Sequence, residues 1–200
     1  YMDGETAREF LNDIGDEADR LTRITEKLLT LTRLDTAPAA EDVPVDVGAV
    51  VERVEHMLSP LARAVEVSLE LKLQPGCVVL ATEDDLYQIA FNLMENAVKY
   101  NLPGGRVLVT LTADGGRVVL RVEDTGVGIP EADLPKIFDR FYRVDKARSR
   151  AAGGTGLGLS IVRDTVLQHG GAVTARRREP EGTCFEVSFA QWNGEEVGRS

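Results

Sequence analysis

The chain has 200 residues, a formal net charge of −10, 43% hydrophobic residues and two cysteines. This acidity argues against broad nucleic-acid binding, which needs clustered basic residues, and two cysteines are too few for a disulfide framework, which fits a reducing compartment. No apolar run reaches the ~20 residues of a membrane span, and no signal peptide is visible. Because the chain opens on Tyr1 and not on Met, we expect it to be an excised piece of a longer protein.

Residues 5–35 are expected to form one long helix. Apolar or small residues recur at heptad positions, with Ile14, Leu21 and Leu28 seven apart and Ala18, Ile24, Thr25 and Leu31 between them. This pattern is typical of a helix that packs against a partner helix, although an amphipathic helix packed on its own domain has it too. A Pro/Ala-rich stretch at 36–45 follows and is expected to be a linker.

The rest of the chain alternates helical and strand patterns, and Asp46 and Thr82 are suited to cap two of the helices. In chain order we expect a helix at 47–61, strands at 65–73 and 77–81, a helix at 83–100, a hairpin of strands 106–112 and 117–124, an irregular segment at 125–156, a helix at 157–169, strands at 172–178 and 183–190, and a polar tail at 191–200. Helices that alternate with mainly hairpin-linked strands predict an α/β sandwich, in which helices cover one face of a mixed sheet.

The helix at 83–100 carries the stretch Asn92–Tyr100. Asn92, Asn96 and Lys99 share one helix face, and Tyr100 lies beside them. Carboxamide oxygens can ligate Mg²⁺, an ammonium group neutralises phosphate oxygens, and an aromatic ring can cover a base. A solvated polar face on an amphipathic helix would give the same pattern.

A second stretch, Asp124–Pro130, leaves the end of an expected strand. A carboxylate at Asp124 can accept a hydrogen bond from an exocyclic amine such as that of adenine. Gly126 and Gly128 would let the backbone approach a flat ligand closely. The alternative is a glycine-rich turn with a solvated aspartate.

A third stretch, Gly153–Leu159, runs directly into a helix. Free N–H groups at a helix N-terminus bind anions, and glycines leave room for phosphates. The stretch is neither a dinucleotide-binding fingerprint nor a P-loop, because its spacing differs and Gly-Lys-Ser/Thr is absent. A flexible loop is the alternative interpretation.

Between these stretches, three aromatic residues precede a basic segment. Phe138, Phe141 and Tyr142 are costly to expose, so some of them should anchor the segment on the core. Six basic residues against two acidic ones lie between positions 136 and 150: Lys136, Arg140, Arg143, Lys146, Arg148 and Arg150, against Asp139 and Asp145. A cationic segment bordered by glycines is suited to a lid over polyphosphate, although a solvated charged loop is possible.

Taken together, the segments Asn92–Tyr100, Asp124–Gly128, Phe138–Phe141 and Gly154–Gly158 resemble the N, G1, F and G2 boxes of sensor histidine kinases, in the family order and with family-like spacing. The resemblance covers residues 5–190. It implies a Bergerat-type ATP-binding catalytic domain of the GHKL superfamily. The implied division is the second helix of a dimerisation and phosphotransfer hairpin at 1–37, a linker at 38–45, the catalytic domain at 46–190 and the tail at 191–200.

The resemblance also implies ATP and Mg²⁺ as cofactors and assigns roles by position. Asn96 is the implied Mg²⁺ ligand with Asn92 beside it, and Lys99 and Arg143 contact the phosphates; these four are the implied catalytic residues. Asp124 reads the adenine amine, and the glycines hinge the lid. The implied nucleotide-binding residues are Asn92, Asn96, Lys99, Tyr100, Asp124, Gly126, Gly128, Phe138, Phe141, Arg143, Gly154, Thr155, Gly156, Leu157 and Gly158.

The same resemblance implies a bacterial, membrane-anchored parent whose cytoplasmic part forms a homodimer. The parent would transfer the γ-phosphoryl group of ATP to a histidine on the first hairpin helix, and from there to an aspartate of a response regulator receiver domain. That helix would lie upstream of this chain. The histidines present, His56 and His169, are expected to be structural or solvent-facing. The fragment alone is therefore expected to bind ATP without transferring phosphate.

Two alternatives remain open. Related ATPases of topoisomerases, chaperones and mismatch repair place a glutamate four residues before the metal-binding asparagine, to activate water. Here Asn92 has that position, and Glu95, about 100° round the helix, is expected to lie on a solvated face, which argues against an ATPase. The other alternative is a nucleotide-binding regulatory module without turnover.

Overall fold

The computed structural model describes residues 41–145 and 154–194, together with helical positions 14, 15, 18, 21, 22, 25, 29 and 32. The latter agree with the helix expected at 5–35, and three of their apolar side chains, Ile14, Leu21 and Leu29, are 50%, 55% and 60% exposed. Leu28 and Leu31 of the expected heptad pattern lie outside the described residues. Within the described part of the chain, no helix has both the length and the apolar character needed to cross a lipid bilayer.

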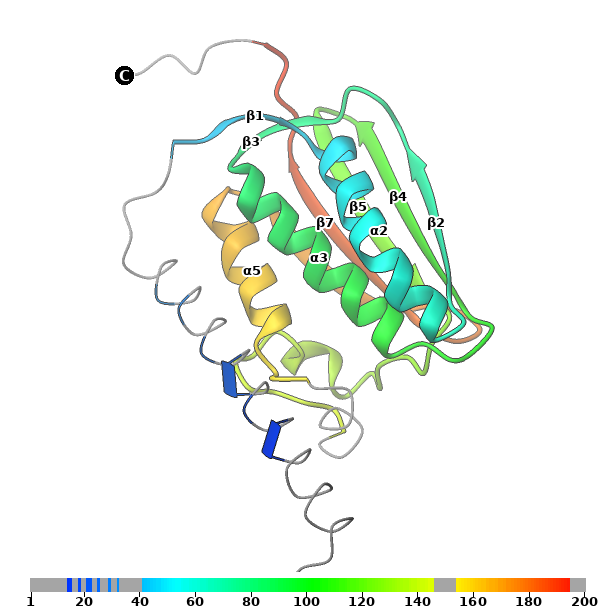
Figure 1. The fold of residues 1–200 in the computed structure, drawn as a ribbon. Coiled ribbons are helices and arrows are strands. Elements are labelled where there is room, and N and C mark those ends of the chain that lie inside the picture. The colour runs from blue at the N-terminus through cyan, green and yellow to red at the C-terminus, as the bar shows by residue number, and fades with distance from the viewer. Residues whose placement is uncertain are drawn as a thin grey trace, which may run out of the picture.

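A five-stranded mixed sheet forms one layer of the domain, and helices form the other (Figure 1). The strand order is β2-β4-β5-β7-β6, where β2 and β4 run parallel and the other neighbours run antiparallel. The strands are β2 (Ser68–Leu73), β4 (Arg106–Asp114), β5 (Arg117–Asp124), β6 (Ala172–Arg177) and β7 (Thr183–Ala190). The helices are α2 (Val47–Ala64), α3 (Glu83–Lys99) and α5 (Gly158–Gln168). The expected α/β sandwich is confirmed.

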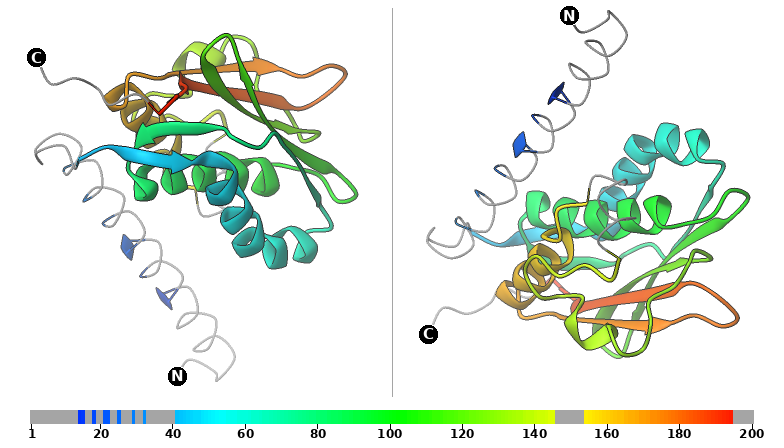
Figure 2. Two further views of the ribbon diagram at one scale, coloured as in Figure 1. Left: turned by 90° about the horizontal axis from the view of Figure 1, so that it is seen from above. Right: turned by 90° about the horizontal axis from the view of Figure 1, so that it is seen from below.

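The core lies between the sheet and the helices, which cover one face of the sheet (Figure 2). The central helix α3 contributes Ile89, Leu93 and Met94, which are at most 1% exposed, and strand β4 places Val107 and Val109 opposite them. The other sheet face is polar, as in the Arg121–Glu186 ion pair of 2.6 Å between β5 and β7. This alternation along the strands explains why the sequence pattern predicted them, although β2 begins at Ser68 and not at residue 65, which caps α2.

One strand of the structure was missed by the sequence analysis. Residues 43–45, expected to be linker, and the expected helix cap Asp46 form β1 (Val43–Asp46), which pairs antiparallel with β3 (Val78–Ala81) in a separate two-stranded sheet. On the other side of β3, the Trp192 N–H donates to the Val78 carbonyl at 2.8 Å. A four-residue strand that contains a proline has almost no local signal, so it becomes visible only through its tertiary partner.

Helix α2 also differs from expectation, because it continues through Pro60 to Ala64. A proline inside a helix removes one N–H donor, which is normally enough to end it. Here Pro60 is exposed, so the carbonyl that loses its donor can bind water, while Leu58 and Ala62 continue the buried stripe on either side. At its start the Asp46 carboxylate accepts from the Gly48 N–H at 2.9 Å, as the capping prediction required.

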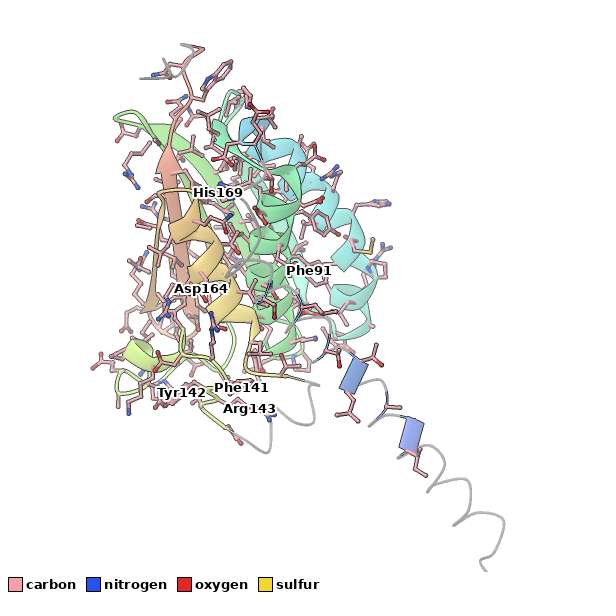
Figure 3. The ribbon with its side chains drawn as sticks, turned by 90° about the vertical axis from the view of Figure 1, so that its left-hand side faces the viewer. Phe91, Phe141, Tyr142, Arg143, Asp164 and His169 are labelled. Atoms are coloured by element: carbon pink, nitrogen blue, oxygen red, sulfur yellow. The ribbon has the colours of Figure 1, made fainter. Side chains whose placement is uncertain are left out.

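His169, directly after α5, joins three parts of the domain. Its side chain is 2% exposed and lies between two carboxylates: Nε2 is 2.8 Å from Asp85 at the start of α3, and Nδ1 is 3.0 Å from Asp42, just before β1. Figure 3 shows His169 at the end of α5 that is remote from Tyr142 and Arg143. The expected structural role of His169 fits this burial, and His56 is exposed on α2.

This arrangement makes the stability of the domain depend on pH. The hydrogen bond with Asp85 raises the pKa of His169 against the opposing effect of burial, and the same bond lowers the pKa of Asp85. The His169 contribution is therefore complete below its ordinary pKa of about 6.5 and is lost as pH rises through the raised value. The Asp85 contribution is present above its ordinary pKa and is lost as pH falls through the lowered value.

We expect His169→Gln to lower the free energy of unfolding by about 1–3 kcal/mol near pH 6, because it leaves two carboxylates without their shared cation. The loss should shrink as pH rises through the raised pKa of His169. Urea unfolding of both proteins across this range measures the difference. His56→Gln, at an exposed position, is the control and should change neither the free energy of unfolding nor its dependence on pH. A His169→Gln loss that stays constant with pH would contradict the assignment of a charged imidazole.

Candidate functional site

A cavity of about 370 Å³ lies at one end of the helical layer. It is bounded by the C-terminal turns of α3, the segment after β5, the start of α5 and the start of β7. Its lining comprises Glu95, Asn96, Lys99, Tyr100, Asp124, Val127, Gly128, Ile129, Pro130, Ile137, Tyr142, Arg143, Val144, Asp145, Gly154, Thr155, Gly156, Gly158, Leu159, Thr183 and Phe185. Three of the four motif segments thus contribute to one cavity, and the fourth, Phe138–Phe141, is represented only by its neighbours Ile137 and Tyr142.

Helix α3 supplies one wall of this cavity. Asn96, Lys99 and Tyr100 line it as expected, because the buried stripe of α3 against the sheet leaves this face toward the cavity. Glu95 lines it as well, and its Oε1 lies 2.8 Å from Lys99 Nζ. The expectation of a solvated Glu95 was wrong, since its side chain is only 18% exposed. One turn of helix separates the two residues, so their side chains meet over the cavity wall.

Asn92 takes a different position from the one expected. It is 2% exposed, does not line the cavity, and its Nδ2 donates to the Gln88 carbonyl at 2.9 Å. Its carboxamide therefore satisfies part of its hydrogen-bonding capacity within α3, one turn below Asn96. A direct contact between Asn92 and a ligand stays a prediction.

Asp124 is a buried acceptor at the cavity, 5% exposed at the end of β5. Its Oδ1 accepts from the backbone N–H of Gly126 at 2.8 Å and of Thr183 at 3.2 Å. Burial raises the pKa of this carboxyl, and the two N–H donors oppose that rise by stabilising the ionised form. Both backbone bonds end on Oδ1, and the Thr183 hydroxyl is a further donor to this carboxylate. Because an ionised carboxylate can accept about four hydrogen bonds, Asp124 can accept one more from a ligand.

Gly126 and Gly182 allow close packing around Asp124. A Cβ on Gly126 would lie 2.3 Å from the Tyr100 carbonyl oxygen, and one on Gly182 would lie 1.9 Å from the Asp124 carbonyl oxygen. Gly126 does not line the cavity, so its role in the structure is to bring the segment after β5 against the end of α3. Gly128, with φ of 69°, does line the cavity, as expected.

The aromatic segment is only partly anchored on the core. Phe138 and Tyr142 pack against core residues, and the Tyr142 hydroxyl donates to Asp133 at 2.6 Å. Phe141 is 59% exposed with φ of 66°, and neither phenylalanine lines the cavity, although Tyr142 and Arg143 do. Figure 3 shows these last two residues beside Phe141, beyond the start of α5. Ligand contacts of Phe138 and Phe141 therefore stay predictions.

The glycine-rich stretch reaches the cavity through Gly154, Thr155, Gly156 and Gly158. Leu157 is fully buried with Ile161, so it holds the start of α5 in place and does not line the cavity. The Phe141 N–H donates to the Gly156 carbonyl at 2.8 Å, which joins the two ends of the intervening segment. Lys146, Arg148 and Arg150 of the expected lid lie outside the described residues.

Several cavity residues were not found from the sequence. Thr183 and Phe185 begin β7, and they reach the cavity because β7 pairs with β5 and brings Cys184 opposite Glu123. Only the strand order reveals this neighbourhood, since the two segments are about sixty positions apart. Val127, Ile129, Pro130 and Ile137 add apolar surface from the irregular segment, where no periodic pattern marks them.

The lining combines two kinds of surface. Apolar side chains and the buried Asp124 acceptor suit a flat ring that carries an amine, and Lys99, Arg143 and the N-terminus of α5 suit anionic groups. Within the described segments, no group of three or more His, Cys, Asp or Glu side chains is placed to hold a metal ion. A divalent cation here would need oxygen ligands from a bound polyphosphate in addition to the Asn96 carboxamide, which is the usual situation for Mg²⁺.

Comparison with known proteins agrees with this reading. Residues 81–192 match the family model described as histidine kinase-, DNA gyrase B- and HSP90-like ATPase. The chain is 34% identical to the sensor-like histidine kinase SenX3 of Mycolicibacterium smegmatis over 191 residues, which are 95% of this chain and 50% of that protein. It therefore spans about half the length of this relative.

Solved structures give a similar result. A mycobacterial sensor histidine kinase, MprB, aligns with a TM-score of 0.64 and 32% identity over 75% of this chain and 97% of that one. Full-length ShkA in complex with AMPPNP aligns with a TM-score of 0.78 and 31% identity over 97% of this chain and 41% of that one.

Proposed function

The chain belongs to the histidine kinase-, DNA gyrase B- and HSP90-like ATPase family, as a catalytic ATP-binding domain of the sensor histidine kinase type, and we propose that it binds ATP with Mg²⁺ in the cavity beside α3. The observation that carries the proposal is the placement of Asp124 and Lys99 in one cavity, with a buried acceptor for adenine and a cation for phosphate. The AMPPNP bound to ShkA, a structural relative, supports the ligand class.

The proposal gives roles to five lining residues and to the start of α5. The second carboxylate oxygen of Asp124 accepts from the adenine amine, and Tyr100 lies against the nucleotide. Lys99 and Arg143 neutralise the phosphates, and the N–H groups at the start of α5 add to that charge. Asn96 would offer a carboxamide oxygen to Mg²⁺, together with phosphate oxygens of the nucleotide. The bound ion would supply charge neutralisation between the phosphates.

In the longer parent protein, the γ-phosphoryl group passes to a histidine outside this chain and then to an aspartate of a response regulator. Neither histidine of this chain suits that role: His169 is buried between Asp42 and Asp85, and His56 belongs to α2, a helix of the cavity-bearing domain itself and not of a preceding hairpin. The parent would be a homodimer through its helical hairpin, anchored in a bacterial membrane with this domain in the cytoplasm.

An ATP-hydrolysing function is less well supported. The position four residues before Asn96 holds Asn92 and not a glutamate, and Glu95 is paired with Lys99. A neutral carboxamide cannot accept a proton from water, so no general base occupies the position where the related ATPases have one.

The proposal is tested with γ-labelled ATP and Mg²⁺. We expect this chain to bind ATP and ADP in preference to GTP by calorimetry, and to take no stable label itself. The same chain extended by its upstream helix should become labelled on a histidine of that helix, and the label should be acid-labile and pass to a receiver domain. Label on His56, or equal affinity for ATP and GTP, would contradict the assignment. Tight ATP binding without label in the extended protein would favour a binding module instead.

A further inference from the structure

We propose that Glu95 is a specificity-determining residue that makes the cavity prefer Mg²⁺-bound nucleotide over metal-free nucleotide. This inference rests on the proposed function, since it concerns the same cavity. It goes further by giving a role to a carboxylate that none of the nucleotide contacts described above requires.

Glu95 lies beside Lys99 in the wall of the cavity. Its Oε1 lies 2.8 Å from Lys99 Nζ, both side chains line the cavity, and they are 18% and 28% exposed. The pair is thus largely withdrawn from solvent, where charges are screened less than at an open surface. The ammonium group of Lys99 already has an anionic neighbour in Glu95. Glu95 therefore competes with any phosphate that uses Lys99.

The second step concerns the charge of the ligand. Metal-free ADP or ATP brings several negative charges to a wall that contains the Glu95 carboxylate beside Lys99. Like charges at short range in a partly enclosed site repel each other. The other two carboxylates of the lining are placed differently: Asp124 accepts from the N–H groups of Gly126 and Thr183, and Asp145 follows Arg143 in the segment after β5.

The third step concerns Mg²⁺. Asn96, the proposed ligand of the ion, is the next residue along α3 and lines the same wall as Glu95. A divalent cation held there would place positive charge next to the Glu95 carboxylate and reduce the charge of the nucleotide at the same time. Glu95 therefore repels free nucleotide, while its interaction with the metal complex is close to balanced. The result is a coupling free energy between metal and nucleotide, with Glu95 as its source.

The variant Glu95→Gln tests this inference, because it removes the charge and keeps the shape. We expect its affinity for ADP in EDTA to rise about fivefold or more, with the affinity for Mg²⁺-ADP changed by less than about twofold, so that the dependence of binding on Mg²⁺ falls by the same factor. Calorimetric titration of the whole chain with ADP, with and without Mg²⁺, measures both. Glu95→Asp should keep most of the wild-type dependence.

Two controls separate this effect from other causes. Glu52→Gln, on the exposed side of α2, makes the same change in net charge away from the cavity and should leave all affinities unchanged. Adenosine, which lacks phosphates, should bind Glu95→Gln and wild type equally. The inference is overturned if Glu95→Gln changes both ADP affinities equally, leaves both unchanged, or weakens only the Mg²⁺ complex as a metal ligand would. If wild type binds neither ADP nor ATP, the proposed function itself fails.

Discussion

Replacing Asp124 with Asn is expected to lower the affinity for ATP and ADP by about 10- to 100-fold. The asparagine keeps an oxygen that can accept from the N–H groups of Gly126 and Thr183, which the Asp124 Oδ1 accepts in the structure at 2.8 and 3.2 Å. Its amide nitrogen then replaces the second oxygen and meets the adenine amine donor to donor. Leaving such a buried donor unpaired costs about 1–3 kcal/mol, which gives the stated range.

Calorimetry with Mg²⁺-ADP and Mg²⁺-GDP measures this effect. Asp124→Asn should also lose most of the preference for adenine over guanine, while its melting temperature stays close to that of wild type because the two backbone donors keep a partner. Glu123→Gln is the matched control, since it changes the adjacent carboxylate of β5 on the opposite face of the sheet and should bind normally. Normal ADP affinity in Asp124→Asn would refute the role of this residue in adenine recognition.

A second large effect is expected for Gly182→Ala. A Cβ at this position would lie 1.9 Å from the Asp124 carbonyl oxygen, and the backbone φ of 109° is unfavourable for alanine. The turn before β7 must therefore move away from the end of β5, which draws the Thr183 N–H away from Asp124. We expect a loss of about 2–4 kcal/mol in the free energy of unfolding, from overpacking together with backbone strain, and a marked loss of ADP binding.

Gly170→Ala separates the effect of backbone strain from that of overpacking. Gly170 also has a positive φ, of 65°, but a Cβ there would meet nothing within 4 Å. This control should lose only about 1 kcal/mol and bind ADP normally. Urea unfolding and calorimetry of both variants give the comparison. Equal losses in the two proteins would mean that the close approach of Gly182 to Asp124 has no energetic importance.

The sequence predicted those parts of the fold whose pattern is local. Helix α3 and the β4–β5 hairpin have strong periodicity, and Gly115 and Gly116, with φ of 56° and 77°, form the turn that their residue types indicate. Strand β1 was missed because its pairing with β3 is a tertiary interaction between short segments. The predicted end of helix α2 was too early because Pro60 was taken as its end, whereas the buried stripe of Leu58 and Ala62 continues the helix to Ala64.

In the site, too, some residues could be predicted from the local sequence and others depend on tertiary contacts. Motif residues that line the cavity, such as Asn96 and Asp124, were predicted because their chemistry differs from that of their surroundings. Leu157 and Gly126 belong to the same motifs but act through packing, and a motif does not say which of its members faces inward. Thr183 came from a distant strand, and Glu95 was misplaced because rotation about the helix axis alone does not reveal how wide the cavity wall is.

Strand β3 brings the two ends of the domain close together. Residues 43–46 pair with one side of it, and Trp192 bonds to Val78 of the same strand, so the polypeptide enters and leaves the domain at neighbouring points. A domain with adjacent entry and exit can be inserted between two other segments of a polypeptide without separating those segments widely. We therefore expect segments joined before β1 and after Trp192 to leave the domain close to each other, at the side of β3.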